Sequence, residues 1–502
     1  MAEKARAGWT AHPVIQLLIV AGLVLLAVAL RARYLDWVTI DWDEDLYRAY
    51  AQDLLRGKLL YRDIWDHKPP GIFYLFALIR LLNPSLQFFR IVAIAWGAGC
   101  GLILYAIGRR LWGFGAGCLA FLGWTAATAD TWGSQSNSEL FFTLFTLAGV
   151  WLFVCCRLPR QQLPEAGTET GFAQLSCFVL VGLFCGMAFQ FKPVTLADFA
   201  AVLLTAAVTP QKARRQFLSM AILGFLLPSL AVFLFFACHG LLGEWLYAVY
   251  TYNFRYVSDP IVEVLQYGPR NLKDVLLDKS PLFLPGFAGL GLMARRERRE
   301  VRFFFWFWVI LSFLSISLGL KFLKHYFLQW MAPMSLAAGY YLAKPLPGHE
   351  VVRRAMLAGF LVWVASITYF QAPDLVKKIQ DWRPVPVISG GEAGRTAAFL
   401  NSRLSGQSVY VWRSPYLSLY WLTGGRPATR FLFWRHLTRR PLVSWIEDEW
   451  QAALSARPPD VIINSELPNS SLKSDLFMRQ FIRERYRILR RLRVLTIYER
   501  KR

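Results

Sequence analysis

The sequence predicts an α-helical membrane protein that crosses the bilayer many times and carries a small α/β domain at its C-terminal end. Of its 502 residues, 55% are hydrophobic and the mean hydropathy is +0.35, which is more apolar surface than one soluble core buries. After about residue 372, long apolar runs give way to short ones separated by turn residues. We therefore expect a transmembrane domain over 1–372 and an extracytoplasmic α/β domain over 373–502.

Apolar runs near the roughly 20 residues that cross a bilayer define the expected spans. The first run lacks a small-residue cleavage site, so we interpret it as an uncleaved anchor. The segment 70–82 is short for a span and ends at Asn83-Pro84, which favours an interfacial or half-membrane helix. The expected spans are 13–30, 88–107, 111–129, 138–156, 173–191, 193–209, 216–238, 281–294, 303–320, 325–343 and 352–371.

The distribution of basic residues predicts the orientation, because short cytoplasmic loops are enriched in Lys and Arg. With the N-terminal tail in the cytoplasm, the basic connectors share that side, provided that 70–82 does not cross the membrane. A crossing at 70–82 would reverse the assignment of everything after it. The expected outer segments are the loops 31–69, 130–138, 239–280 and 321–324 and the whole C-terminal region.

The net charge and the positions of the cysteines indicate which binding partners and which cross-links to expect. The formal charge of +23 is spread over loops and tail, and no DNA- or RNA-binding motif accompanies it, so we expect no nucleic-acid partner. The arginines between Arg483 and Arg493 can rest on anionic headgroups or approach an anionic substrate. All seven cysteines lie in or beside predicted spans, where small packing residues are expected.

The C-terminal region predicts strands that alternate with helices, which indicates an α/β domain. At about 120 residues it is large enough for its own core. It has no Gly-rich phosphate loop and no Cys/His cluster, so we interpret it as an accessory lid or an acceptor-recognition module. The expected elements are helices over 391–404 and 416–422 and strands over 408–412, 461–464 and 494–498.

The first outer loop opens with a carboxylate cluster formed by Asp41, Asp43, Glu44 and Asp45. Closely spaced carboxylates repel one another, which raises the pKa of at least one of them. Such a group can take a proton from an acceptor hydroxyl or hold a divalent cation. A helix over 44–56 capped by one of these acids is an equally open interpretation.

The same loop ends in Asp66, His67 and Lys68, followed by two prolines. The prolines fix the backbone and suit the first turn of the next helix, which would hold Lys68 at the mouth of the membrane. There the lysine can bind a departing lipid phosphate, or it can snorkel to a headgroup as a simple anchor.

Further polar groups interrupt or border the predicted spans on the same outer side. An ionisable group at a span entrance is a functional candidate by default. Two lysines and a histidine lie beside the span 325–343 on the predicted outer side, where basic residues are normally rare. Their presence favours an anionic ligand there. A helix break or an interfacial aromatic belt explains several of the others equally well. The candidate residues are Glu139, Lys192, Arg255, Lys321, Lys324, His325, Tyr326 and Gln329, with Gln135 and Asn137 beside Glu139.

Together these motifs resemble the bacterial branch of the GT-C glycosyltransferases, which includes dolichyl-phosphate-mannose protein mannosyltransferase-like proteins and lipid A aminoarabinose transferases. The resemblance extends over nearly the whole membrane domain. It implies a GT-C-like fold of about 11–13 transmembrane helices with a C-terminal α/β domain. The residues that carry it are Asp43-Glu44, Tyr61 to Gly71, Asn137-Ser138-Glu139, Lys192-Pro193 and His325 to Gln329 ahead of Pro333.

The resemblance implies transfer of a sugar, by a hexosyl- or pentosyltransferase, from a polyprenyl-phosphate carrier. The acceptor would be a lipid, glycan or protein on the extracytoplasmic face of the inner (plasma) membrane. By position, Asp43 would be the catalytic carboxylate with Glu44 beside it, and Lys68 would help bind the donor phosphate. Asp45 stands where many such proteins have glycine. His67 stands where the aminoarabinose transferases have glutamate, which argues against their donor.

We expect an inverting transfer in which Asp43 acts as general base and Glu44 assists or orients it. Lys68, with Lys321, Lys324 or His325, would stabilise the departing lipid phosphate. No cofactor is required for this reaction. A divalent metal is compatible with it, and its ligands would be Asp43 and Glu44.

Two other classes of protein fit parts of the pattern. A lipid-linked glycan flippase would line a translocation path with the same polar groups, although charges buried in mid-span would suit it better. A scaffold protein would use the α/β tail to bind a cell-envelope partner. A substitution of Asp43 that abolishes sugar transfer but leaves folding intact would identify the protein as an enzyme and not as a flippase or a scaffold.

Overall fold

A computed structural model describes residues 12–158, 171–209, 213–257, 261–344, 350–380, 391–403, 406–438, 444–465 and 472–501. The chain divides into two compact units, which are described separately. The helical unit comprises Met1–Leu35, Arg90–Phe235 and Ser258–Trp382. The loop–sheet unit comprises Asp36–Phe89, Phe236–Val257 and Arg383–Arg502, so it joins the predicted first outer loop to the C-terminal region.

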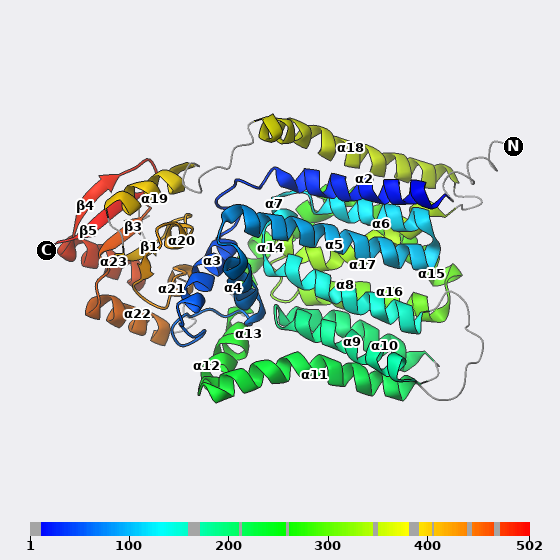
Figure 1. Ribbon diagram of the computed structural model, residues 1–502, viewed down its shortest axis with the longest axis horizontal. Coiled ribbons are helices and arrows are strands. Elements are labelled where there is room, and N and C mark those ends of the chain that lie inside the picture. The colour runs from blue at the N-terminus through cyan, green and yellow to red at the C-terminus, as the bar shows by residue number, and fades with distance from the viewer. Residues whose placement is uncertain are drawn as a thin grey trace. The chain divides into compact units, whose positions relative to one another are not determined.

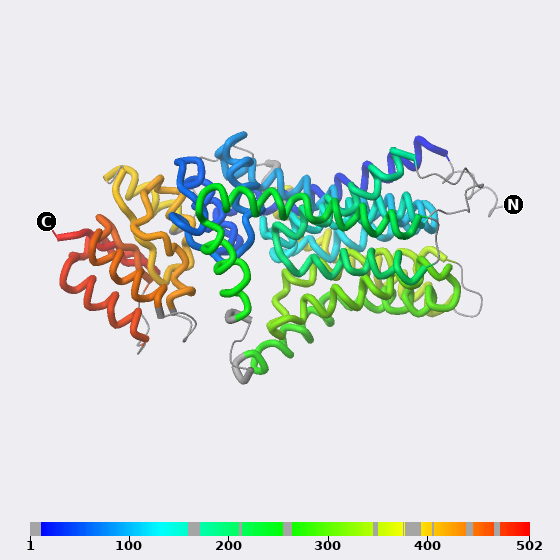
Figure 2. Tube along the Cα trace, turned by 90° about the horizontal axis from the view of Figure 1, so that it is seen from below, coloured from blue at the N-terminus to red at the C-terminus, as the bar shows by residue number. Residues whose placement is uncertain are grey.

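The helical unit is a bundle whose long helices run side by side (Figures 1 and 2). Its helices are α2 (Pro13–Ala32), α5 (Leu86–Trp112), α6 (Phe114–Ala127), α7 (Thr131–Ser134), α8 (Ser138–Arg157), α9 (Phe172–Phe189), α10 (Leu196–Val208), α11 (Arg214–Cys238), α14 (Ile261–Asp278), α15 (Ser280–Arg296), α16 (Arg299–Ile316), α17 (Leu328–Ala343) and α18 (Glu350–Gln380), with 3-10 turns η1 (Pro193–Thr195) and η3 (Lys324–Phe327).

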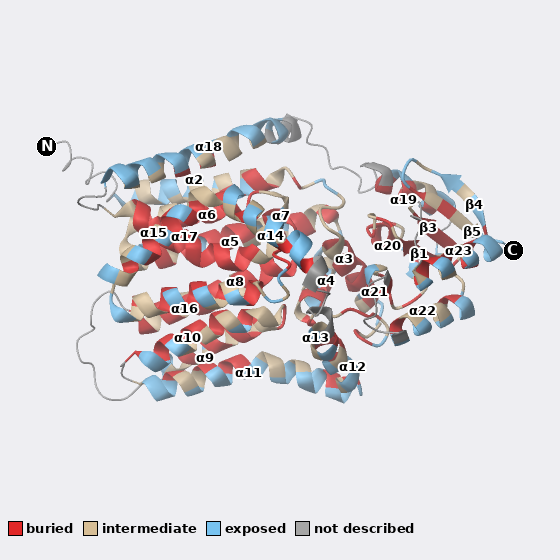
Figure 3. Ribbon diagram, turned by 180° about the vertical axis from the view of Figure 1, so that it is seen from behind, coloured by how far each residue is buried: buried red, intermediate tan, exposed pale blue. Residues whose placement is uncertain are grey.

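Helix α17 forms the centre of this bundle. All its residues from Leu328 to Leu342 are buried, and it packs against α6, α15 and α16. The outer helices α11 and α18 expose most of their apolar side chains instead (Figure 3). A helix that is apolar all round either is buried in a protein core, as α17 is, or faces lipid, for which the exposed apolar side chains of α11 and α18 are suited.

Among the described residues, six helices are long and apolar enough to cross a membrane, or up to seven if the bent pair α14–α15 counts as one span. The chain is therefore a multi-pass membrane protein. Fewer helices pass this test than the eleven spans expected from the sequence. One reason is length, since α6 with 14 residues and α17 with 16 reach only about 21–24 Å at 1.5 Å per residue.

Two segments differ from their predicted local structure. The segment 239–280, predicted as an outer loop, is largely helical: it contains α12 (Leu242–Leu246), a π-helical turn (Tyr247–Thr251), α13 (Tyr252–Val257) and α14. The helix predicted over 44–56 begins two residues earlier, as α3 (Trp42–Leu55). The segment after the two prolines forms α4 (Gly71–Leu82), a short apolar helix as expected.

The C-terminal part of the loop–sheet unit contains a five-stranded sheet in the order β2-β1-β3-β5-β4. β1 is parallel to β2 and β3, while β5 is antiparallel to β3 and β4. The strands are β1 (Ser408–Trp412), β2 (Arg426–Pro427), β3 (Val461–Asn464), β4 (Tyr486–Arg491) and β5 (Thr496–Arg500), with helices α19 (Gly391–Arg403), α20 (Leu419–Leu422), α21 (Arg435–Thr438), α22 (Ser444–Ala456) and α23 (Lys473–Arg485).

The sheet confirms the predicted strands at 408–412 and 461–464, whose residues are almost all buried. β4 was missed because three of its six residues are arginine and most of it is exposed. An edge strand needs no apolar alternation on its outer side, and charged side chains there prevent further pairing.

Small residues allow close helix packing inside the bundle. A Cβ at Gly289 in α15 would lie 2.1 Å from the carbonyl oxygen of Ala337 in α17, whereas a Cβ at Gly291 in the same helix would meet no atom within 4 Å. We expect Gly289→Ala to lower the stability of the detergent-solubilised protein by about 1–3 kcal/mol, because backbone must move. Thermal unfolding monitored by circular dichroism measures this.

Gly291→Ala is the matched control. It adds the same methyl group to the same helix without a clash, and alanine favours a helix over glycine by about 1 kcal/mol. Its melting temperature should equal or exceed that of the wild type. Equal effects of the two changes would show that the close approach of α15 and α17 contributes nothing to stability.

Candidate functional site

The carboxylate cluster begins helix α3. The side chain of Asp41 is the N-cap and accepts a hydrogen bond from the backbone N–H of Trp42 at 2.8 Å. Asp43, Glu44 and Asp45 follow in the first turn, where the positive end of the helix dipole favours negative charge. The capping role proposed as the alternative therefore applies to Asp41, and it leaves Asp43 available for other contacts.

Asp43 and Lys68 form an ion pair across the loop. The distance from Lys68 Nζ to Asp43 Oδ2 is 3.1 Å, and the side chains are 19% and 23% exposed, respectively. Lys68 Nζ also lies 5.1 Å from the ring centroid of Tyr47, within cation–π range. The pair is thus reachable from solvent while most of its surroundings are buried.

The backbone around Lys68 is held by hydrogen bonds on both sides. Its N–H donates to Asp66 Oδ1 at 3.0 Å, and its carbonyl accepts from the Tyr61 hydroxyl at 2.8 Å. Pro69 and Pro70 follow directly and restrict the chain as predicted. Asp66 is almost completely buried and contacts Lys68 through its backbone N–H.

His67 points into an aromatic cluster of the same unit. Its ring centroid lies 5.5 Å from that of Tyr252 and 5.2 Å from that of His436. Its carbonyl accepts a hydrogen bond from Asn253 Nδ2 at 2.7 Å, and its Nδ1 lies 3.6 Å from Asp66 Oδ1. These contacts connect the His67-Lys68 segment to α13.

Glu44 and Asp45 are fully buried, in contrast to Asp43. Glu44 accepts a hydrogen bond from the backbone N–H of Ile40 at 3.0 Å. Asp45 accepts from Thr39 Oγ1 at 2.8 Å and pairs with the buried guanidinium of Arg48 at 3.3 Å. Asp43 is therefore a partly exposed carboxylate, whereas the buried carboxylates of Glu44 and Asp45 hold the start of helix α3 in place.

Burial changes the protonation of the acids. It raises the pKa of Asp41 well above its ordinary value, and the neighbouring Asp43 raises it further. It raises the pKa of Asp45 to about 7, against the opposing effect of Arg48. The predicted rise within a crowded carboxylate cluster is thus found, with burial as its largest cause.

Lys68 remains a cation at neutral pH. Burial acts to lower its pKa, but Asp43, Tyr47 and Asp66 outweigh burial and place the pKa well above its ordinary value. Burial raises the pKa of Asp66 itself. A permanently charged lysine suits contact with an anion better than proton transfer.

Asp43 and Glu44 do not fit the predicted metal site. Asp43 already contacts the Lys68 ammonium, and the buried Glu44 binds a backbone N–H. In the described ranges, no group of three or more His, Cys, Asp or Glu side chains is arranged to hold a metal ion.

A second group of predicted residues meets within the helical unit. Lys192 Nζ bonds Glu139 Oε1 at 2.5 Å and lies 3.9 Å from the ring centroid of Tyr326. His325 Nε2 is 3.9 Å from the same Glu139 oxygen. These four side chains come from the start of α8, the turn before η1 and η3, which are far apart in the sequence.

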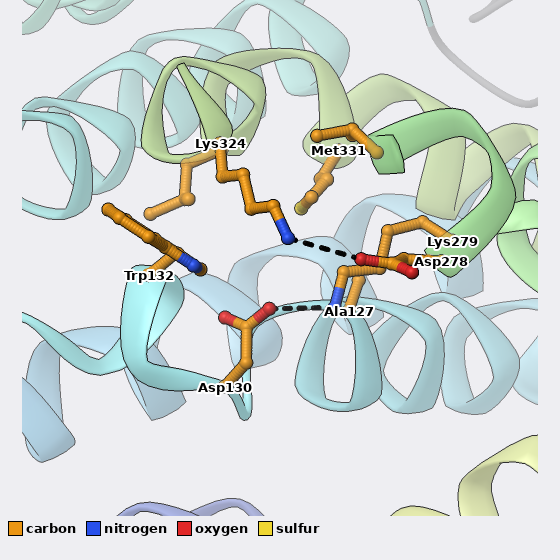
Figure 4. A pocket seen from close by; sticks show the side chains of 9 residues that line it. Ala127, Asp130, Trp132, Asp278, Lys279, Lys324 and Met331 are labelled. Atoms are coloured by element: carbon orange, nitrogen blue, oxygen red, sulfur yellow. Dashed lines mark hydrogen bonds and ion pairs between the residues drawn. The ribbon is translucent and has the colours of Figure 1, made fainter. Parts of the chain in front are cut away.

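Beside this group, two ion pairs surround the bend between α14 and α15 (Figure 4). The two helices are bent by 83°. Lys324 Nζ lies 3.4 Å from Asp278 Oδ2, and Lys279 Nζ lies 2.8 Å from Asp130 Oδ2. Trp132 lines the same pocket and stacks on His325 with centroids 6.2 Å apart. The predicted anion-binding Lys324 is thus neutralised by a carboxylate that the sequence did not single out.

The remaining candidates are less accessible. Lys321 is 5% exposed and Gln329 is 3% exposed, and the Gln329 amide donates to Asp198 Oδ2 at 2.7 Å. Arg255 lies in α13, but its side chain is outside the described part of the structure. Asp198, Asp130 and Lys279 were missed, although a charged residue next to a break in an apolar run is a signal that could have found them.

Comparison with known proteins identifies the fold. No family model matches the chain, and no curated protein matches it in sequence. Among solved structures, ArnT from Cupriavidus metallidurans bound to undecaprenyl phosphate is similar with a TM-score of 0.65 at 12% identity, over 97% of this chain and 98% of ArnT. This chain has the GT-C fold. The fold class predicted from the sequence is confirmed.

Two other GT-C glycosyltransferases support the same fold. The archaeal oligosaccharyltransferase AglB from Archaeoglobus fulgidus, in complex with an inhibitory peptide and a dolichol-phosphate, has a TM-score of 0.53 at 14% identity, over 90% of this chain and 69% of AglB. The mycobacterial arabinofuranosyltransferase AftD has a TM-score of 0.53 at 14% identity, over 97% of this chain and 40% of AftD. A crystal structure of the Archaeoglobus enzyme is a complex with Zn and sulfate.

The pKa of Asp45 predicts a pH-dependent stability. The folded state holds this proton up to about pH 7, whereas the unfolded state releases it near pH 4, so stability should fall as pH rises from 4 to 7. The slope is at most about 1.4 kcal/mol per pH unit. In Asp45→Asn this contribution should disappear, as measured by thermal unfolding in detergent across that range.

Asp63→Asn is the control for this experiment. Its pKa is lowered, first by the hydrogen bond from Arg62, so Asp63 is ionised in both states above pH 5 and should add no slope from pH 5 to 7. An unchanged slope in Asp45→Asn would show that Asp45 stays ionised beside Arg48.

Proposed function

We propose that this protein is a membrane glycosyltransferase that moves a sugar from a polyprenyl-phosphate-linked donor to an acceptor on the extracytoplasmic face of the inner membrane. The observation that carries the proposal is the partly exposed Asp43–Lys68 pair, in which a carboxylate and a cation lie 3.1 Å apart. The similar structures with undecaprenyl phosphate and dolichol-phosphate support the class of donor.

The two residues have separate tasks in an inverting transfer. As the acceptor oxygen attacks the anomeric carbon, its proton passes to the Asp43 carboxylate. The bond between the anomeric carbon and the phosphate oxygen breaks, and both electrons leave with the polyprenyl phosphate. The Lys68 ammonium stabilises the charge that develops on this leaving group.

Neighbouring residues hold Asp43 and Lys68 in position. Glu44, proposed to assist Asp43, contributes by holding the start of α3 through its bond to Ile40. Asp66 and His67 set the backbone that presents Lys68, through the contacts with the Lys68 N–H and Asn253. His67 in place of the glutamate of aminoarabinose transferases favours a different donor sugar.

We propose that the second group binds the lipid-linked substrate in the helical unit. Lys192, Lys324 and His325 would contact phosphate oxygens, exchanging their present carboxylate partners for the ligand. Tyr326 supports Lys192 through its ring. Glu139, Lys321 and Arg255 remain proposed substrate-binding residues on the basis of their sequence positions, whereas the amide of Gln329 is already bonded to Asp198 and Val194.

Replacing Asp43 tests the enzymatic assignment. We expect Asp43→Asn to lower kcat for sugar transfer by about 10²–10⁴-fold, because an amide cannot accept the acceptor proton. The measurement is product formation from a radiolabelled polyprenyl-phosphate sugar in proteoliposomes, with monodispersity in size-exclusion chromatography as the test of folding.

Asp63→Asn, in the same loop but half-exposed and paired with Arg62, should keep full activity. Wild-type transfer by Asp43→Asn would refute the assignment of Asp43. Translocation of lipid-linked glycan by a wild-type protein that transfers no sugar would support a flippase instead.

Replacing Lys68 tests donor binding. Lys68→Ala removes the cation and should raise the donor KM by about tenfold or more, since a charge-assisted contact is lost. Lys68→Arg keeps the charge and should recover part of the affinity. Initial rates over a range of donor concentrations separate KM from kcat. An unchanged donor KM in Lys68→Ala would exclude phosphate binding by Lys68.

A further inference from the structure

A carboxylate lies buried among the helices of the helical unit. Asp198, in the first turn of α10, is 1% exposed. Its Oδ1 accepts from Trp308 Nε1 of α16 at 2.8 Å, and its Oδ2 accepts from Gln329 Nε2 of α17 at 2.7 Å. Within the described ranges, no lysine, arginine or histidine forms an ion pair with it. Charged groups at such positions are rare and usually functional.

Gln329 connects this carboxylate to the turn that carries Lys192. Its Nε2 also donates to the backbone carbonyl of Val194 at 3.3 Å, and its Oε1 accepts from Ser315 Oγ at 3.4 Å. Thr195 closes the turn, because its N–H and hydroxyl both donate to the Lys192 carbonyl, at 3.2 and 3.0 Å. One amide therefore holds the first turn of α10 and the backbone two residues after Lys192.

The direction of Lys192 depends on this turn. Lys192 has an extended backbone (φ −160°, ψ 126°) between α9 and Pro193, and its N–H donates to the Ala188 carbonyl at 3.4 Å, the last such bond before the chain leaves α9. Its ammonium meets both Glu139 and the ring of Tyr326. A small rotation of the turn would move Nζ away from both partners, since a lysine side chain is long.

We propose that Asp198 and Gln329 are positioning residues that hold the 192–195 turn so that Lys192 is presented to a phosphate-bearing lipid. Asp198 orients the Gln329 amide, and Gln329 holds Val194. The proposal rests on the proposed function only in assigning Lys192 to substrate binding. It gives Gln329 a role through the backbone instead of direct contact with substrate.

The experiment compares two variants that each remove one hydrogen bond to Asp198. Gln329→Met removes the bonds to Asp198, Val194 and Ser315, whereas Trp308→Phe removes only a bond that does not reach the turn. The probe is undecaprenyl phosphate, titrated against the full-length protein in detergent with the thermal shift as readout. Amide hydrogen exchange of peptides covering 190–197 reports the turn itself.

We expect Gln329→Met to weaken binding of undecaprenyl phosphate by about 10- to 100-fold, because a small displacement of a binding group has effects of this size. We also expect faster amide hydrogen exchange in residues 190–197. Trp308→Phe should lower the melting temperature but leave both readouts near wild type. Equal effects of the two variants, or no effect of Gln329→Met, would overturn the proposal. If Gln329→Met does not fold, Asp198→Asn, which keeps the shape but replaces an acceptor oxygen by a donor, takes its place.

The two proposals fail in different ways. Hydrogen exchange needs no catalytic turnover, so it tests the turn even if the wild-type protein transfers no sugar. If the wild type transfers sugar and Gln329→Met changes neither exchange nor affinity, only the positioning role is wrong. If exchange changes but affinity for undecaprenyl phosphate does not, Lys192 is not a phosphate ligand, and the positioning proposal is overturned together with that assignment.

Discussion

The need to satisfy every backbone polar group inside the bilayer governs this structure. Continuous helices meet it by themselves, but each interruption exposes N–H and C=O groups that need other partners. The interruptions here carry polar side chains: Gln329 binds the Val194 carbonyl in the 192–195 turn, and Asn271 Nδ2 binds the Lys321 carbonyl at 2.9 Å. The proposed ligand Lys192 therefore lies where the chain already required polar neighbours.

In the loop–sheet unit, the first segment must accommodate a cluster of acidic side chains. Helix α3 places its acids at the positive end of its dipole and buries two of them. The following loop is fixed by hydrogen bonds to distant parts of the chain. Trp65, for example, donates its N–H to the Arg430 carbonyl at 3.0 Å. The C-terminal domain thus helps to shape the loop that contains Lys68.

The sequence predicted the fold class, the strands at 408–412 and 461–464, and the loop that contains the Asp43–Lys68 pair, because apolar runs and acidic clusters are local signals. It did not predict that Glu44 is buried while Asp43 is partly exposed, since this difference arises from contacts such as that between Glu44 and Ile40. It also missed Asp198, Asp130 and Lys279. Their partners come from other helices, and one sequence does not show which helices are neighbours.

The ion pair between Asp43 and Lys68 has a consequence for the order of events. While the lysine holds the carboxylate, that carboxylate is a weaker base, because its negative charge is already compensated. An incoming phosphate competes for the same ammonium and would release the carboxylate only when the donor is seated. In the proposed reaction, binding of the donor phosphate therefore makes Asp43 a stronger base. Without bound donor, Asp43 would seldom activate a hydroxyl group or a water molecule.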